Sequence, residues 1–493
     1  MNTKALRQKV LDLAIQGKLV PQNPNDESAT VLLEKIRAEK AEKIKKGELK
    51  ADKKDSFIFV GSDKRHYEQF ADGTVKDIED EIPFEVPDGW AWCRLGELFY
   101  HTTGKALKKS NNKGSLRKYI TTSNLYWNKF DFTEVREMYF TDDELDKCTI
   151  KKGDLVLCNG GDVGRAAIWN YNEDICYQNH VSRLRPKIEG INNSLYLYLL
   201  MFYKEQGMLN GKGVGITSLS ANDLLSAIFP LPPLNEQNSI VTSIENIFEQ
   251  IEHLDQEKSD LQTIIKQTKS KILDLAIHGK LVPQDPNDEP AEELLKRIVT
   301  SDNRPYEKVY EEPFDIPDSW KWVKLNDLAE IARGGSPRPI QDYITEDKDG
   351  INWIKIGDTS EESKYITSAK EKIKPEGKRH SRFVHAGDFL LTNSMSFGRP
   401  YILKIDGCIH DGWLVFANIK ECILQDYLYY ALSSAYIYET FSNVAAGSTV
   451  KNLKSDTVKQ VTFPLPPLPE QQRIIEAIEN MYEVLGQIQN NLI

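Results

Sequence analysis

The chain has 493 residues, of which 40% are hydrophobic and 28% are charged, a balance typical of a folded protein with two to four domains and not of a disordered or fibrous one. Its formal net charge of −11 excludes a uniformly basic nucleic-acid-binding protein, although it leaves room for local basic surfaces. The longest apolar run, 195–203, is about half as long as a membrane span, and no secretory signal opens the sequence. We therefore expect a cytoplasmic protein with no membrane association.

The first predicted element is a helical segment over 1–37, and part of it occurs twice in the chain. Residues 9–27, KVLDLAIQGKLVPQNPNDE, return at 271–289 as KILDLAIHGKLVPQDPNDE, with 16 of 19 positions identical. A Lys-rich stretch follows at 38–83, and its counterpart before the second domain is shorter. We interpret 38–83 as a linker and its Lys-rich run AEKAEKIKKGELKADKKD, at 38–55, as a solvated helix, with a DNA-contacting arm as the alternative.

Two globular domains are predicted, over 84–234 and 314–468. The first contains the short β-like runs YITTSNL and DLVLCN and the tyrosine-rich helical run LYLYLLMFY. The second contains INWIKIGD, DFLLTN and DYLYYALSSAYIY in the same order. Together with the Gly- and Asn-rich turns, these runs predict α/β domains with short, twisted, mostly antiparallel strands.

Further repeated motifs show that both halves of the chain follow one plan. IPFEVPDGWAW precedes the first domain and EPFDIPDSWKW the second, while FPLPPLNEQ and FPLPPLPEQ close them. Inside the domains KKGDLVLCN matches HAGDFLLTN, and each is followed five residues later by Gly-Arg. The tryptophans of the first motif pair are predicted to pack where the chain enters each domain.

A long helical pattern over 235–300 follows the first domain, and a shorter one over 469–493 follows the second. Seam positions recur at alternating steps of four and three and are apolar except for two polar breaks, at Lys258 and Thr268, which predicts a coiled-coil seam. The seam residues are Ile240, Ile244, Ile247, Ile251, Leu254, Leu261, Ile265, Ile272 and Leu275 of the first pattern, Ile474, Ile478, Met481, Leu485, Ile488 and Leu492 of the second, and Leu6, Val10 and Leu13 of the N-terminal segment.

The shorter pattern stops at about the point in the repeat where the N-terminal segment begins. We therefore expect the two chain ends to complete one helix that packs antiparallel against the central helix. A linker over 301–313 would then connect the central segment to the second domain. The alternative is that all of these are ordinary amphipathic surface helices.

The sequence contains no motif for catalysis or for a cofactor. The GKGVG stretch at 211–215 is not followed by the GK[ST] of a phosphate-binding loop, and the two Pro-Asp pairs share no downstream ExK that would suggest a nuclease. The six cysteines have no CxxC spacing, and the histidines have no zinc-ligand spacing. We predict reduced thiols and no metal, and we predict that the chain itself is not an enzyme.

The duplicated plan, the two FPLPPLxEQ junctions and the LDLAIxGKLVPQ segments resemble the specificity subunits of Type I restriction-modification systems, over nearly the whole chain. The resemblance implies an α+β fold with two pseudo-twofold-related target-recognition domains, separated by a long antiparallel helical coiled coil. Each domain would read one half of a bipartite site in double-stranded DNA, and the helices would set the spacer.

The same resemblance implies which partners supply the chemistry. Two methyltransferase subunits would use S-adenosylmethionine, and two motor-nuclease restriction subunits, where they accompany the complex, would use ATP and Mg. No cofactor is implied for this chain. The alternatives are a self-contained DNA methyltransferase or nuclease with an unrecognised site, and a symmetric protein-interaction scaffold.

Basic residues in the variable loops are the predicted DNA contacts, because Arg and Lys bind phosphates and base edges. They are Lys105, Lys108, Lys109, Arg117, Lys118, Arg165 and Lys212 in the first domain, and Arg333, Arg338, Lys355, Arg379, Arg382, Arg399 and Lys451 in the second. Gln178, Asn179 and His180 are further candidates for base edges. Arg165 and Arg399 follow a glycine in the same repeated turn, so we predict equal roles at the phosphate backbone, with a purely structural turn as the alternative.

Overall fold

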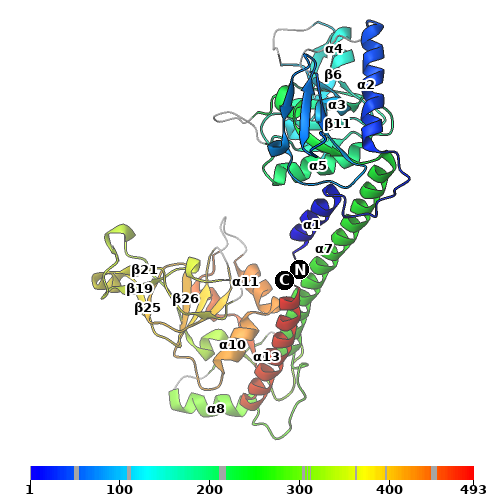
Figure 1. The fold of residues 1–493 in the computed structure, drawn as a ribbon. Helices are drawn as coiled ribbons and strands as arrows, with labels where there is room; N and C mark the ends of the chain where they lie inside the picture. The colour runs from blue at the N-terminus through cyan, green and yellow to red at the C-terminus, as the bar shows by residue number, and fades with distance from the viewer. Residues whose placement is uncertain are drawn as a thin grey trace. The chain divides into compact units, whose positions relative to one another are not determined.

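The computed structural model describes residues 2–48, 55–107, 113–209, 218–302, 306–307, 309–310, 312–360, 363–394, 397–445 and 452–492. The chain forms two compact units, Met1–Gln256 and Glu257–Ile493, and the boundary between them lies within the helix α7 (Leu234–Ile277) (Figure 1). Both units mix helices and sheets, so the predicted α+β fold class is confirmed.

The elements of the first unit are, in chain order, α1 (Thr3–Ile15), α2 (Ala29–Lys45), β1 (Ser56–Val60), β2 (His66–Phe70), β3 (Val75–Asp77), η1 (Glu79–Glu81), β4 (Ala91–Arg94), α3 (Leu95–Leu98), β5 (Phe99–Thr103), β6 (Ser115–Ile120), η2 (Thr122–Asn124), β7 (Leu125–Tyr126), β8 (Lys129–Phe130), β9 (Arg136–Phe140), α4 (Asp142–Lys147), β10 (Thr149–Ile150), β11 (Leu155–Cys158), β12 (Ala166–Ile168), β13 (Ile175–Tyr177), β14 (Val181–Pro186), α5 (Asn193–Glu205), α6 (Ala221–Leu225) and β15 (Ile228–Leu231), followed by the first part of α7.

The elements of the second unit after α7 are α8 (Ala291–Asp302), β16 (Lys321–Lys324), α9 (Leu325–Leu328), β17 (Glu330–Arg333), η3 (Ile340–Asp342), β18 (Ile344–Thr345), β19 (Ile351–Ile354), η4 (Ile356–Asp358), β20 (Tyr365–Ile366), β21 (Glu371–Ile373), η5 (Pro375–His380), β22 (Arg382–Val384), β23 (Phe389–Thr392), β24 (Pro400–Leu403), β25 (Gly407–Ile409), β26 (Trp413–Ala417), α10 (Gln425–Leu432), α11 (Ala435–Val444), α12 (Ser455–Lys459), β27 (Thr462–Leu465) and α13 (Leu468–Asn491).

Two small sheets lie at the centre of each domain. Their strand orders are β12-β11-β14-β5 and β10-β13-β6-β9 in the first domain, and β17-β26-β23-β24-β20 and β18-β21-β19-β25-β22 in the second. The strands pair antiparallel except β6 with β13 in the first domain, and β19 with β25 and β20 with β24 in the second. The prediction of short and mostly antiparallel strands is therefore confirmed.

The repeated motifs at the start and end of each domain pair with one another as strands. In the first domain β4 pairs with β15, and Trp92 lies opposite Pro230. In the second domain β16 pairs with β27, and Trp322 lies opposite Pro464. These two-stranded sheets bring the chain back to the point where it entered, so that each long helix starts beside the first strand of its domain.

A buried glutamate at the start of each long helix connects three of the repeated motifs. Glu236 is 5% exposed, and its carboxylate accepts hydrogen bonds from Trp90 Nε1 at 2.9 Å and from Gln22 Nε2 at 2.7 Å. Burial raises the pKa of this carboxyl, although both hydrogen bonds oppose the shift. The second unit repeats the arrangement with Glu470, Trp320 and Gln284, at 2.9 and 2.5 Å.

Replacing Trp90 or Trp320 by phenylalanine is expected to lower the free energy of unfolding by about 1–3 kcal/mol more than replacing Trp92 or Trp322. All four indoles are buried, but Nε1 of Trp92 and Trp322 has no hydrogen-bond partner among the described residues. Only the first two replacements therefore leave a buried carboxylate oxygen without its donor. Urea unfolding followed by circular dichroism measures the difference, and equal losses at all four positions would contradict it.

The helix α1 packs against the first part of α7 inside the first unit (Figure 1). Val10 and Ala14 lie in the same buried cluster as Ile240 and Ile244. Nearer the start of α1, Arg7 forms an ion pair of 3.2 Å with Asp255, which is farther along α7. The two helices therefore run antiparallel.

The helix α13 packs against the last part of α7 inside the second unit in the same way. Ile474 and Ile478 share a buried cluster with Ile272 and Ile277, and the hydroxyl of Tyr482 donates to Lys269 O at 3.1 Å. This pair is also antiparallel. The predicted seam residues that remain exposed are Leu6, Leu254, Met481 and Ile488.

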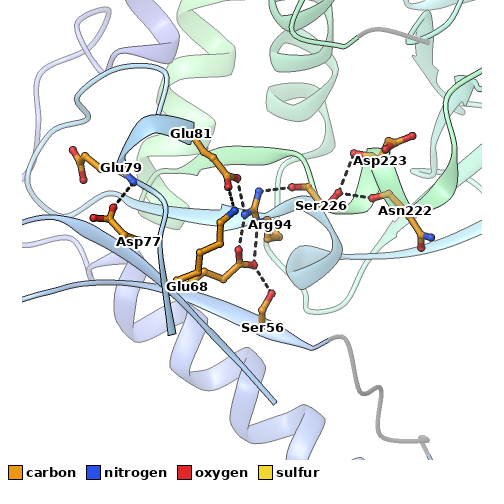
Figure 2. Close-up of polar contacts among 10 residues, drawn as sticks. Ser56, Glu68, Asp77, Glu79, Glu81, Arg94, Asn222, Asp223 and Ser226 are labelled. Carbon is orange, nitrogen blue, oxygen red and sulfur yellow. Dashed lines mark hydrogen bonds and ion pairs between the residues drawn. The ribbon is translucent and has the colours of Figure 1, made fainter. Parts of the chain in front are cut away.

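The segment 38–83 begins with the last turns of α2, up to Lys45, where the Lys-rich run is predicted to be helical. It then contains a folded sheet where the sequence predicts only a linker. Residues 56–77 form a three-stranded antiparallel sheet in the order β1-β2-β3. Glu68 of β2, at 5% side-chain exposure, accepts two hydrogen bonds from Arg94 of β4, at 3.1 and 2.6 Å (Figure 2). The sheet is thus attached to the first domain by an ion pair, which the Lys-rich composition of the segment did not indicate.

Candidate nucleic-acid interface

Both domains have the same arrangement of a glycine and an asparagine that hold one turn by hydrogen bonds, where β5 and β17 end. We call this arrangement the frame. In the first domain the N–H of Gly104 donates to Val181 O at 3.2 Å, and the side-chain amide of Asn159 donates to Asn179 O at 3.2 Å. A Cβ on Gly104 would lie 2.2 Å from Tyr177 O, so only glycine fits at this position. The frame presents residues 178–180 in a turn before β14.

The second domain builds this frame from the matching residues. The N–H of Gly334 donates to Trp413 O at 2.9 Å, and the side-chain amide of Asn393 donates to Asp411 O at 2.8 Å. A Cβ on Gly334 would lie 2.2 Å from His410 O. The turn that corresponds to residues 178–180 is therefore 410–412, and the two turns carry different side chains on one scaffold.

The turn of the first domain carries neutral polar side chains. Gln178 and Asn179 are half-buried and His180 is exposed. Backbone N–H groups hold the turn in place, from Gln178 to Ile120 O and from Asn179 to Lys105 O, both at 3.0 Å. The predicted DNA contacts Arg117 and Lys118 are exposed on β6.

Lys105 is engaged inside its own domain. Its ammonium group donates to Glu144 Oε2 at 2.6 Å and to Tyr139 O at 2.7 Å, and it lies 5.2 Å from the centre of the Phe140 ring. The side chain is 8% exposed. These contacts tie the loop after β5 to α4, a distant pairing that the sequence does not reveal.

Arg165 also makes several contacts inside its domain. Its guanidinium donates to Thr122 O at 2.7 Å, pairs with Asp162 at 3.3 Å and lies 5.1 Å from the centre of the Tyr126 ring. Arg399 is half-buried in the matching turn, where its N–H donates to the hydroxyl of Thr392 at 2.8 Å. The contacts of Arg165 suit a structural turn, and the role of the pair at DNA stays a prediction.

The second domain gathers three of the predicted arginines around one turn. Arg333 at the end of β17 donates from Nε to Asp411 O at 3.0 Å, and Arg382 at the start of β22 donates from Nε to Arg333 O at 2.8 Å. Arg338, in the loop after β17, lies 3.4 Å from Asp411 Oδ2. All three arginines are exposed. The fold thus brings together basic residues that are up to 49 positions apart.

The way in which Arg333 and Arg382 are held suits anion binding. Each donates to a backbone carbonyl through Nε, and the terminal nitrogens of each make no hydrogen bond to another described residue. Two parallel N–H groups of a guanidinium match the two oxygens of a phosphate. Both side chains are therefore oriented by the protein and still have donors for a DNA backbone.

Asp411 is the acidic residue at the centre of this group, and the sequence-based prediction omitted it. Its Oδ1 accepts a hydrogen bond of 2.9 Å from the hydroxyl of Ser336. Burial acts to raise the pKa of Asp411, but the Ser336 hydrogen bond and nearby positive groups outweigh it, so the pKa is lowered. Asp411 follows Cys408 by three residues, as Asn179 follows the matching Cys176. Alignment of the two halves of the sequence could therefore have identified Asp411 as the counterpart of Asn179.

The remaining candidates fall into two groups. Lys355 pairs with Glu371, and Arg379 is exposed on η5 with its Nε 3.1 Å from His380 Nε2. The predicted contacts outside the described residues are Lys108, Lys109, Lys212 and Lys451.

Within the described ranges no group of His, Cys, Asp or Glu side chains could hold a metal ion. None of the helices in these ranges has both the length and the hydropathy of a membrane span.

Comparison with protein families identifies both domains. A model described as "Type I restriction modification DNA specificity domain" matches residues 87–263 and again 317–493. Each match begins at a PDxW motif and continues through the domain into the helix that follows it. The family is therefore found once in each half of the chain, in agreement with the internal repeat.

Individual relatives match over nearly the whole chain. The Type I restriction enzyme EcoEI specificity subunit of Escherichia coli is 26% identical, with 99% of this chain and 90% of the relative covered. The EcoAI specificity subunit of Escherichia coli is 25% identical, with 98% and 90% covered.

Two solved structures share the fold. A crystal structure of the HsdS subunit from Thermoanaerobacter tengcongensis matches with a TM-score of 0.53 at 18% identity, covering 84% of this chain and 94% of that one. A chain from a structure of a type I R-M system, described in terms of complex assembly and conformational transition, matches with a TM-score of 0.57 at 17% identity, covering 83% and 94%.

Proposed function

Because the chain belongs to the family of Type I restriction modification DNA specificity domains, we propose that each of its two domains reads one half of a bipartite site in double-stranded DNA. The helix pairs formed by α7 with α1 and with α13 would set the spacing between the half-sites. In this proposal the protein supplies sequence recognition and no catalytic group.

The observation that carries the proposal is the shared frame with different side chains at its turn. Gly104 and Gly334 hold equivalent turns by equivalent hydrogen bonds, but one turn carries Gln178 and Asn179 whereas the other carries Asp411 among arginines. Amides and guanidinium groups are the side chains that read base edges in the major groove. Recognition of a bipartite site with two different halves requires two domains of the same fold that carry different side chains at the contact with DNA.

Partner subunits would supply the chemistry. Relatives of this chain are named as specificity subunits of Type I restriction enzymes, so we propose that it assembles with two methyltransferase subunits that use S-adenosylmethionine. Two restriction subunits that use ATP and Mg would join where cleavage accompanies methylation. The chain itself would hold no cofactor, and the complex would act on DNA in the cytoplasm.

The experiment that tests this function is reconstitution of the full chain with its methyltransferase subunits, followed by single-molecule sequencing of methylated DNA. We expect a bipartite motif whose two halves are unrelated and whose gap is constant. Residue changes confined to one domain should alter only one half of the motif.

Two results would contradict the proposal. Methylation or cleavage by the purified chain alone would show that it is a self-contained enzyme. A complex that assembles without any sequence-selective DNA binding would show that the symmetry of the chain serves assembly.

A further inference from the structure

An aspartate at the centre of an arginine group is unexpected in a surface that binds phosphates. The Asp411 carboxylate would repel a phosphate, because like charges at close range are unfavourable. Its side chain is 41% exposed, and three arginines surround its turn. If the surface bound only the DNA backbone, a neutral side chain at this position would serve better.

The carboxylate is held in a defined position. The backbone carbonyl of Asp411 accepts hydrogen bonds from Asn393 Nδ2 at 2.8 Å and from Arg333 Nε at 3.0 Å, so the turn is anchored from two sides. Ser336 then fixes one carboxylate oxygen at 2.9 Å. An ionised carboxylate only accepts hydrogen bonds, so the second oxygen presents an oriented acceptor at the surface.

Arg338 is the partner of that second oxygen in the unbound protein, and the contact is weak. The two groups are 3.4 Å apart, and the Arg338 side chain is 81% exposed. Exposed ion pairs contribute little, because water solvates both charges. Both groups can therefore exchange this contact for hydrogen bonds to DNA without a large loss.

The hydrogen-bonding chemistry of this pair matches one base pair. A carboxylate accepts from the N4 amino group of cytosine, and an arginine donates two hydrogen bonds to O6 and N7 of guanine. Cytosine and guanine are partners in the same base pair, and their major-groove edges lie side by side. We propose that Asp411 and Arg338 together recognise a G·C pair in the half-site read by the second domain, an inference that rests on the proposed function.

The test uses the full chain with its methyltransferase subunits and a pool of duplex DNA with random sequence. The wild-type complex should select a G·C pair at one position of one half-site. Asp411→Asn should shift the preference at that position toward adenine, because an amide pairs with N6 and N7 of adenine. Asp411→Ala and Arg338→Ala should each reduce discrimination at that position about 10- to 100-fold.

The first domain supplies the matched control. Asn179 occupies the position equivalent to Asp411, with its carbonyl held by Asn159 in the same way, so Asn179→Ala should change the other half-site and leave the G·C position intact. Thermal unfolding of each variant shows whether the fold is retained. A general loss of folding would lower selection of both halves, whereas a specific contact changes one position.

The outcomes distinguish this inference from the function on which it rests. A bipartite motif that keeps the same bases in the Asp411 and Arg338 variants would overturn the G·C assignment and leave the function in place. Absence of any selected motif with the wild-type complex would overturn both.

Discussion

Replacing Arg333 and Arg382 together by glutamate is expected to lower the affinity of the protein for duplex DNA about 100-fold. Both guanidinium groups are exposed and oriented by backbone carbonyls, so each can bind one phosphate. Each lost phosphate contact should also reduce the slope of log affinity against log salt by about one. Fluorescence anisotropy with a labelled duplex at several salt concentrations measures both effects.

The matched control is the double change Lys296→Glu with Arg297→Glu. These residues are exposed on α8, where they pair with Glu293 and Glu289, and the change alters the net charge of the chain by the same amount. We expect a much smaller loss of affinity than for Arg333 and Arg382. Equal losses in the two double variants would mean that only the net charge matters and that the arginine group has no direct contact with DNA.

Replacing Arg94 by methionine is expected to destabilise the first unit by about 3–5 kcal/mol, the range seen when one partner of a buried ion pair is removed. Arg94 donates to Glu68, to Glu81 at 2.9 Å and to Ser226 O at 2.6 Å (Figure 2). Without Arg94, the Glu68 carboxylate would lie buried with no cation. Urea unfolding at neutral pH measures the loss.

A second substitution separates the ion pair from packing. Adding Glu68→Met to Arg94→Met removes the uncompensated charge and should restore much of the stability, because an apolar pair can replace a buried ion pair at little net cost. A double variant as unstable as Arg94→Met alone would show that the loss comes from packing around β4 or from the Ser226 contact.

The same ion pair has a pH signature. Burial acts to raise the pKa of Glu68, but hydrogen bonds from Arg94 and Ser56 outweigh it, so the pKa is lowered in the folded protein. A group with a lowered folded pKa contributes stability above its unfolded pKa and loses it as the pH falls through the folded value. The difference between wild type and Arg94→Met should therefore shrink below about pH 4, and an unchanged difference would contradict this assignment.

Much of the fold could be predicted from the sequence because the chain contains its plan twice. Each repeated motif has a structural partner in the other repeated motifs: Gln22 and Trp90 meet Glu236, and β4 pairs with β15. A buried polar group requires a hydrogen-bond partner. The three motifs that supply the glutamine, the tryptophan and the buried glutamate therefore occur together in each half of the chain. The duplication therefore indicated two equivalent domains and their attached helices.

The sheet over residues 56–77 could not be predicted because its stability depends on a contact outside the segment. The sheet follows a Lys-rich run that is typical of a solvated linker, and no copy of the segment exists in the second half for comparison. Glu68 becomes an acceptable buried residue only because Arg94 lies against it in the folded protein. Composition alone cannot show such a pairing.

The candidate DNA surface shows the same division between sequence and tertiary structure. By itself, the sequence determined the family resemblance, the duplicated frame and a set of basic residues, because these depend on residue identity and spacing. Only the tertiary structure decided which cations are engaged internally, as Lys105 is by Glu144, and which gather at the surface, as Arg333 and Arg382 do near Asp411. The physical reason is that the environment of a charge depends on residues far away in sequence, which only the fold brings within hydrogen-bonding distance.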